Sequence, residues 1–231
     1  MSSSLLAKVT LGALGAGTAT TGVIYFGKGF LVSEHVKTTT SIRELLKSVH
    51  PYKRLISESL KGDSTEWKAT WQTYRDKYKD KDSNPFSLVN ETVKSSDANA
   101  PSEFMSQCSS ISKEHVVDGN DAKYQAVLNY CTRDALINDW IAERNSNKAL
   151  LSETSEEAGK WKESWQKYKN ANTDKEQSKD KWNLSDWGSK HSDADAPESF
   201  KKECKKRYEA KTEASSEDDY LNVLNWCTKT V

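Results

Sequence analysis

The chain lacks the short motifs by which many enzymes and binding proteins are recognised. None of the patterns G-x-x-x-x-G-K-[ST], G-x-G-x-x-G, H-E-x-x-H or G-x-S-x-G occurs in its 231 residues, so no phosphate-binding loop, zinc-protease helix or nucleophile elbow is indicated. The four histidines are scattered along the chain: His35, His50, His115 and His191. We therefore predict that the protein is not an enzyme and has no catalytic, cofactor-binding or metal-binding residues.

An excess of charge of either sign is also absent. Lysines and arginines number 34, aspartates and glutamates also number 34, and the formal net charge is zero. The two main charged stretches, 75–82 and 172–181, each mix both signs. Because nucleic acid is bound through a concentration of positive charge that releases counterions, the sequence argues against nucleic acid as a partner.

Hydrophobic residues are scarce. They make up 35% of the chain, against about 45–50% in ordinary globular proteins, while 29% of the residues are charged. A domain of about ninety residues buries only about 60–65% of its chain surface on folding. A core with so few hydrophobic residues must depend on the eight tryptophans and nine tyrosines, and covalent cross-links would add to its stability.

The longest uncharged stretch lies near the amino terminus. Eighteen residues, Val9 to Phe26, carry no charge and are flanked by lysines. That length is close to the shortest helix that crosses a hydrocarbon core, which needs about 17–25 residues. We predict a membrane anchor over residues 1–32 and a short polar stalk over 33–40. A secretory signal cleaved after Ala19 and a merely apolar tail are the alternatives.

The charges beside this stretch do not fix the side of the membrane on which the body lies. One lysine precedes the stretch, and positive residues favour the cytoplasmic side. Four positive residues follow it: Lys28, Lys37, Arg43 and Lys47. A long downstream domain, however, crosses the membrane largely regardless of its charge. The cysteines therefore decide the predicted orientation.

One signature occurs twice and organises the rest of the chain. Each copy has two tryptophans and a tyrosine at helical spacing, an Asp-Ala-x-Ala-Pro run, a phenylalanine and a cysteine four residues apart, and a closing aromatic-Cys-Thr. In the first copy these residues are Trp67, Trp71, Tyr74, Asp97 to Pro101, Phe104, Cys108 and Tyr130 to Thr132. In the second copy they are Trp161, Trp165, Tyr168, Asp193 to Pro197, Phe200, Cys204 and Trp226 to Thr228. The fixed offset predicts two repeat units of one architecture, 41–132 and 136–228.

Hydrophobic spacing predicts helices throughout both units. Ser41 to Val49 and Leu136 to Glu143 each have apolar residues on one face. The tryptophan and tyrosine stripes lie on one face of a longer helix, where core packing is the usual role. Asp63 and Thr154 are expected to cap these longer helices, because an acidic residue stands three positions on. The predicted fold class is all-α, with an N-terminal transmembrane helix followed by two tandem related helical bundles.

Between the longer helix and the proline of each unit the two copies diverge most. The stretches 75–84 and 169–181 are charged and are expected to be exposed, where length changes are tolerated. Phe86 to Leu88 matches Trp182 to Leu184 and predicts one short packed turn in each unit.

A proline follows an aspartate-containing run in each unit. Pro101 and Pro197 are expected in the first turn of the next helix, where a missing N–H leaves no bond unmade. The aspartates ahead of them, Asp97 and Asp193, invite an acid–base interpretation. They lie in separate units with equivalent surroundings, so we expect them to turn the chain or face the helix start rather than to catalyse a reaction.

The four cysteines form two equivalent pairs, Cys108 with Cys131 and Cys204 with Cys227, each 23 residues apart. Each lies on the apolar face of its helix, so both sulfurs of a unit meet if its last two helices pack antiparallel. We favour disulfides in these pairs, although four cysteines allow three pairings, and buried free thiols or a metal site are alternatives. Metal ligands usually come as C-x₂₋₄-C, which is absent. Disulfides persist in oxidising compartments, so these pairs point to the outer face of a membrane.

Several short motifs, taken in order, resemble a known family. They are a Met-Ser-Ser start before a Gly/Ala/Thr-rich apolar segment, Leu-Leu-Ser-Glu-Thr at 150–154, W-K-x-x-W-x-x-Y at 161–168 and Leu-Asn-Trp-Cys-Thr at 224–228. Over most of the chain the pattern resembles the lineage-specific paralogous proteins of haemotropic mycoplasmas. The resemblance implies a membrane-associated protein exposed on a wall-less cell, with a role in host contact or antigenic variation. It supplies no catalytic residues.

These observations predict a membrane-anchored, surface-exposed, non-enzymatic helical protein whose charged loops meet host surface molecules or antibodies. Its predicted partners are the membrane, through the N-terminal helix, and such host molecules, but not nucleic acid. The sequence leaves the oligomeric state open. The alternative is an inward-facing helical scaffold with reduced thiols.

Overall fold

The computed structural model describes residues 38–231, and this part of the chain is mainly α-helical. The predicted membrane anchor, 1–32, and the first five residues of the predicted stalk lie outside the described residues. Within the described part, no helix combines the length and the apolar character needed to cross a membrane. The helical fold class is therefore confirmed in its coarse form, and the membrane helix stays a prediction.

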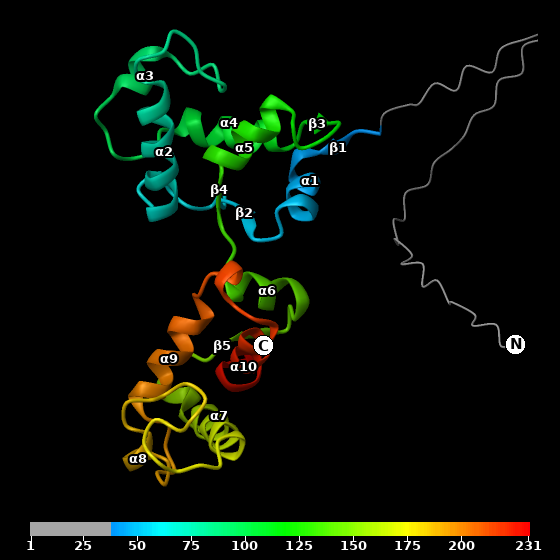
Figure 1. Ribbon diagram of the computed structural model, residues 1–231. Helices are drawn as coiled ribbons and strands as arrows, with labels where there is room; N and C mark the ends of the chain where they lie inside the picture. Colours follow the sequence, from blue (N-terminus) through cyan, green and yellow to red (C-terminus); the bar gives the residue numbers. More distant parts are fainter. Residues whose placement is uncertain (1–37) are drawn as a thin grey trace, which may run out of the picture. The chain divides into compact units, whose positions relative to one another are not determined.

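The helices follow one another in the same order in the two repeats, where repeat 1 denotes residues 41–132 and repeat 2 denotes residues 136–228 (Figure 1). Repeat 1 contains the helices α1 (Ile42–Val49), α2 (Thr65–Tyr78), α3 (Asn90–Lys94), α4 (Ser102–Ser112) and α5 (Ala122–Tyr130). Repeat 2 contains α6 (Ile137–Arg144), α7 (Ala158–Ala171), α8 (Trp187–Lys190), α9 (Glu198–Tyr208) and α10 (Glu217–Cys227). Two short 3₁₀ helices, η1 (Ser155–Glu157) and η2 (Thr212–Ala214), also lie in repeat 2.

Short antiparallel strands join segments that are far apart in each repeat, which the all-α prediction did not include. The pairs are β1 (Thr40–Ser41) with β3 (His115–Val116), β2 (Lys53–Leu55) with β4 (Thr132–Asp134), and β5 (Lys148–Leu150) with β6 (Thr228–Thr230). Leu136 and Lys211 form one further bridge, which is the counterpart in repeat 2 of the β1–β3 pair. Ladders of two or three residues are too short to produce the apolar–polar alternation by which a strand is recognised in a sequence.

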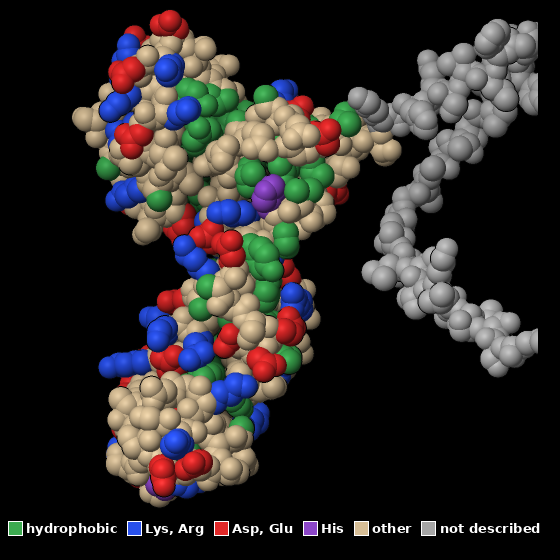
Figure 2. All heavy atoms as spheres, in the orientation of Figure 1, with side chains coloured by type: hydrophobic (Ala, Val, Ile, Leu, Met, Phe, Trp, Pro, Cys, Tyr) green, Lys and Arg blue, Asp and Glu red, His purple; other side chains and the backbone are tan. Residues whose placement is uncertain are grey.

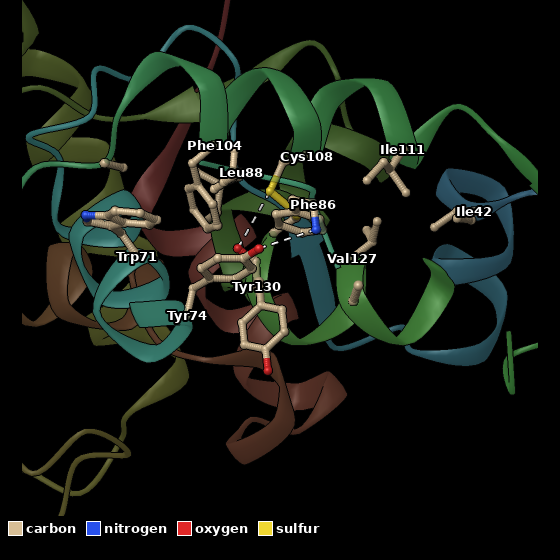
Figure 3. Packing of buried hydrophobic residues seen from close by; sticks show 14 of the residues in the cluster. Ile42, Trp71, Tyr74, Phe86, Leu88, Phe104, Cys108, Ile111, Val127 and Tyr130 are labelled. Atoms are coloured by element: carbon tan, nitrogen blue, oxygen red, sulfur yellow. Dashed lines mark hydrogen bonds between the residues drawn. A yellow bond between two sulfur atoms is a disulfide. The ribbon is translucent and has the colours of Figure 1, made fainter. Parts of the chain in front are cut away.

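Each repeat has its own aromatic core. The tryptophan and tyrosine stripe of α2 is buried against Phe104 of α4, and the stripe of α7 is buried against Phe200 of α9. The ring centroids of Tyr74 and Phe104 lie 5.1 Å apart, and those of Tyr168 and Phe200 lie 5.0 Å apart. Figure 3 shows Tyr74 and Phe104 within the packed cluster of repeat 1. The interpretation of both stripes as core is confirmed, and such ring pairs add about 0.5–1.5 kcal/mol each beyond the area that they bury.

The short packed turn is present in both repeats. The outer residues of Phe86 to Leu88 and of Trp182 to Leu184 are buried in the two cores. The middle residues, Ser87 and Asn183, both have left-handed backbone conformations, with φ of 52° and 53°. The left-handed conformation turns the chain so that the residues on either side face the core, and asparagine adopts it more readily than most residues.

A buried tyrosine holds each of these turns. In repeat 1 the Tyr74 hydroxyl donates to Asn84 Oδ1 at 2.6 Å and accepts from the backbone N–H of Phe86. In repeat 2 the Tyr168 hydroxyl donates to Asp180 Oδ2 at 2.5 Å. The prediction that the charged stretches 75–84 and 169–181 are exposed is wrong at Arg75, Asn172 and Asp180, which are buried. The Asp180 carboxylate is buried because it accepts the Tyr168 hydroxyl and the backbone N–H of Leu184.

Several helix starts differ from their predicted positions. Ser64, and not Asp63, caps α2, and its hydroxyl accepts the backbone N–H of Trp67. Thr154 caps only η1, so α7 begins later than predicted. Pro101 is the N-cap of α4, and Pro197 is likewise the N-cap of α9, one residue before the first turn. These shifts of a residue or more arise because the caps depend on side-chain geometry as well as on residue type.

Candidate functional site

The four predicted site residues are cysteines, and the structure joins them in the two expected pairs. Cys108 of α4 is bonded to Cys131 at the end of α5, and Cys204 of α9 is bonded to Cys227 at the end of α10. The Cα–Cα separation is 5.4 Å in both pairs, and all four side chains are buried. Figure 3 shows Cys108 in the same core as Phe104. Each bridge thus closes the last two main helices of its repeat around the aromatic core.

The aspartates that invited an acid–base interpretation have structural roles. The backbone carbonyl of Asp97 accepts the indole N–H of Trp71 at 3.3 Å, and that of Asp193 accepts the indole N–H of Trp165 at 3.1 Å. The Asp97 side chain is exposed, and it accepts the backbone N–H of Asn99, two residues on. The two aspartates belong to different repeats and form no common site. Each run therefore anchors a core tryptophan, which its place in the sequence did not reveal.

The histidines within the described residues also stay apart. His50 Nδ1 lies 2.7 Å from the Tyr124 hydroxyl, His191 Nδ1 lies 3.0 Å from the carbonyl of Trp187, and His115 is exposed in β3. Within residues 38–231, no three His, Cys, Asp or Glu side chains gather closely enough to hold a metal ion.

Glu157 is a buried acidic residue that was expected to complete a cap at the helix surface. Its carboxylate forms an ion pair with Lys229 of β6 and accepts the backbone N–H of Ser152 at 2.7 Å. The hydrogen bond from Lys229, followed by that from Ser152, lowers the pKa of Glu157 to about 2. The residue ties the start of α7 to β6 at the carboxyl end of repeat 2.

An open groove lies in repeat 1, beside the first turn of α6 of repeat 2. It has a volume of about 480 Å³, which falls in the usual range of about 300–1,000 Å³ for small-ligand sites. Its walls come from α1, from β2 and the residues after it, from β4, and from Asp139 in the first turn of α6. The lining residues are Arg43, Leu46, Lys47, Lys53, Arg54, Leu55, Ile56, Ser57, Glu58, Arg133 and Asp139.

Positive side chains dominate this groove. Arg54 and Arg133 stand directly opposite each other on β2 and β4, an arrangement that is unfavourable for two like charges. Each guanidinium is offset by a carboxylate that it binds through two nitrogens, Arg54 with Glu143 and Arg133 with Asp139. The hydrogen bonds that Arg133 donates to Asp139 raise the pKa of Arg133. Burial alone would raise the pKa of Asp139, but the contact with Arg133 outweighs it, so that pKa is lowered.

The sequence contains a signal for this groove in the differences between its two repeats. When the two repeats are aligned, Arg43, Lys47 and Arg54 of repeat 1 correspond to uncharged residues of repeat 2. Those residues are Asn138, Ala142 and Ala149. A difference between otherwise equivalent copies marks a position that the shared fold does not require.

Comparisons with protein-family models, with curated proteins and with solved structures give no match to this chain.

Proposed function

We propose that the protein is anchored in a membrane and displays its helical body on the outer face, where it acts by contact and not by catalysis. The observation that carries this proposal is the geometry of the cysteines. All four are buried at disulfide distance in equivalent places of the two repeats. Disulfides form and persist in oxidising compartments, whereas cytosolic thiols are kept reduced.

The proposed architecture is a transmembrane helix followed by two tandem helical bundles. The uncharged stretch Val9 to Phe26 is long enough for such a helix. Two hydrophobic clusters, one formed within 42–131 and the other within 137–227, support a division of the body into two related bundles.

The proposed contact surfaces are the charged loops of the two repeats, which would meet host surface molecules or antibodies. Residues 79–83 and 173–179 are exposed throughout, and they differ between the repeats in length and sequence. Figure 2 shows positive and negative side chains intermixed over the visible face of the body. A surface of mixed charge favours selective protein contacts over binding to nucleic acid.

A second candidate function is an inward-facing scaffold with reduced thiols. It is favoured by the positive residues that follow the apolar stretch, since these prefer the cytoplasmic side. The cysteines then pack as small buried hydrophobic residues.

Protease treatment of intact cells separates these two candidates. Trypsin should cleave at the exposed lysines of 79–83 and 173–179, and peptides from both loops should appear in the medium while a cytoplasmic marker protein stays whole. If the body is cut only after the cells are lysed, the inward-facing scaffold replaces our proposal.

A further inference from the structure

A buried polar group without a hydrogen-bond partner lies near the repeat 1 groove. The Trp67 side chain is 2% exposed, and its indole N–H has no hydrogen-bond acceptor among the described residues. The equivalent Trp161 of repeat 2 donates its indole N–H to the carbonyl of Ser152 at 2.7 Å. Both indoles otherwise pack alike, each edge-on to a phenylalanine with ring centroids 6.1 Å apart. Buried polar groups are nearly always paired, so the unpaired donor of Trp67 needs an explanation.

A small cavity lies beside this indole. It has a volume of about 20 Å³, and Trp67 and both cysteines of the repeat 1 disulfide line it. Ser109 and Ser112 of α4 form part of its wall. At the corresponding positions of α9, repeat 2 has the larger residues Lys205 and Tyr208, and Tyr208 packs against its core. Small side chains on α4 therefore leave space beside Trp67.

The cavity adjoins the larger groove. Arg43, Leu55, Ile56 and Glu58 line both of them. A single extended segment that lies in the groove can therefore place one group in the cavity. That group must be an acceptor, because the indole N–H is a donor only. The nearby Glu58 carboxylate disfavours a second negative charge there, so a neutral peptide carbonyl suits the cavity better than a carboxylate.

Negative groups suit the rest of the groove. Five cationic residues line it against the two carboxylates of Glu58 and Asp139. Four of the five are in ion pairs, whereas Lys47 is in none within residues 38–231. Of the five N–H donors of each guanidinium, Arg54 uses four and Arg133 uses three in hydrogen bonds within the protein. Lys47 and the remaining N–H donors of Arg54 and Arg133 favour a carboxylate as the partner at this wall, because hydrogen bonds between charged groups are stronger than neutral ones.

We propose that the groove of repeat 1 binds an extended acidic peptide. One backbone carbonyl of the peptide accepts the Trp67 N–H in the cavity, and its carboxylates lie along Lys47, Arg54 and Arg133. Repeat 2 lacks both halves of this site, because its tryptophan is paired internally and three of the basic positions are uncharged. The inference deepens the proposed contact function by giving the chemistry of a partner, and it rests on that function for its biological role only.

Binding is tested with the purified full chain and fluorescently labelled peptides of equal length. Fluorescence anisotropy should show that hexaglutamate binds more tightly than hexaglutamine, and that hexalysine does not bind. Raising the salt concentration should weaken the hexaglutamate complex, because charges at the surface are screened. Binding of hexaglutamine as tight as that of hexaglutamate would overturn the proposal.

Two tryptophan variants form a matched pair for the cavity. Trp67→Phe removes the proposed donor and should weaken hexaglutamate binding about three- to tenfold, the equivalent of one hydrogen bond. Trp161→Phe makes the same change in repeat 2 and should leave the affinity unchanged. Equal affinities of the two variants would contradict the proposal, whether both bind like the wild type or both are weakened.

A third variant tests the basic wall without disturbing the core. Lys47 is in no ion pair, so Lys47→Ala leaves the fold intact and should weaken binding about two- to fivefold, as expected for an exposed charge. An unchanged affinity would remove the acidic part of the proposal even if Trp67→Phe fails to fold. Because the purified chain is used, acidic-peptide binding and outward exposure are separate results: either one can fail while the other stands.

Discussion

The two repeats share one fold but differ in the side chains that lie next to its core. Both have an aromatic stripe on a long helix, a disulfide that joins the last two main helices, and a strand pair that joins the first helix to the last. Repeat 1 keeps small residues and an unpaired indole N–H at Trp67, whereas repeat 2 fills the same region and pairs Trp161 with Ser152. The core and its disulfide thus maintain the fold in both repeats, and the residues next to the core can differ without loss of the fold.

The packed turn shows a second difference of this kind. Asn84 of repeat 1 corresponds to Asp180 of repeat 2, and Ile111 corresponds to Arg207. The guanidinium of Arg207 lies 5.0 Å from the ring centroid of Trp182, so repeat 2 has charged groups at this turn where repeat 1 has Asn84 and Ile111. Burial, and then the Asp180 carboxylate, raises the pKa of the Tyr168 hydroxyl. One backbone frame thus accommodates either a neutral or a charged version of the same turn.

We expect the largest effect from removing one disulfide at a time. Replacing Cys108 and Cys131 together with serine should lower the free energy of unfolding of repeat 1 by about 3 kcal/mol, the value for a loop of this length in the chain-entropy model. Repeat 2 should change little, because the two hydrophobic clusters are separate. Hydrogen exchange of the full chain, followed by mass spectrometry of peptides from each repeat, measures both effects in one sample.

The matching variant, with Cys204 and Cys227 replaced by serine, should show the opposite pattern. Loss of protection in both repeats from either double substitution would show that the two cores unfold as one, contrary to the division proposed here.

A smaller effect is expected from the two tryptophan variants. Trp161→Phe loses the hydrogen bond to Ser152, whereas Trp67→Phe loses none. Trp161→Phe should therefore lower the free energy of unfolding by about 1 kcal/mol more than Trp67→Phe does. Urea unfolding of the full chain, followed by circular dichroism, measures the difference. Equal losses would mean that the indole N–H of Trp67 is also paired in solution.

The smallest effect is expected from acid. Folding lowers the pKa of Glu157 from 4.5 to about 2, through the hydrogen bonds from Lys229 and Ser152. A lowered pKa in the folded state contributes stability that is fully present above about pH 4.5 and is lost as the pH falls towards about 2. The corresponding residue of repeat 1, Asp63, is exposed. The urea midpoint of the wild type should therefore fall more steeply over this range than that of Glu157→Gln. Parallel pH profiles would exclude a stabilising role for this ion pair.

The helices and the core could be predicted because their signals are local and repeated. The residues Trp67, Trp71 and Tyr74 stand at i, i+4 and i+7, a spacing that only a helix places on one face. The same spacing recurs in repeat 2, and the cysteines fall on equivalent faces of equivalent helices. Both the buried stripes and the two cysteine pairs could therefore be read from the chain.

The strands, the buried acids and the groove depend on contacts between distant residues. Trp67 and Trp161 stand in the same local pattern, W-K-x-x-W-Q-x-Y, yet only Trp161 is paired. Their difference depends on side chains of another helix, such as Ser112 and Tyr208, and no local pattern contains that information. Asp180 likewise lies in a charged stretch whose composition predicts exposure, and only its contact with Tyr168 explains its burial.

We propose that two repeats, each closed by its own disulfide, are displayed on the outer face of a membrane. The most direct test is peptide mapping without reduction, on protein taken from its native membrane with free thiols blocked at lysis. We predict cross-linked peptides that contain Cys108 with Cys131 and Cys204 with Cys227, and no blocked thiol. Four blocked thiols would contradict the claim and would instead place the body in a reducing compartment.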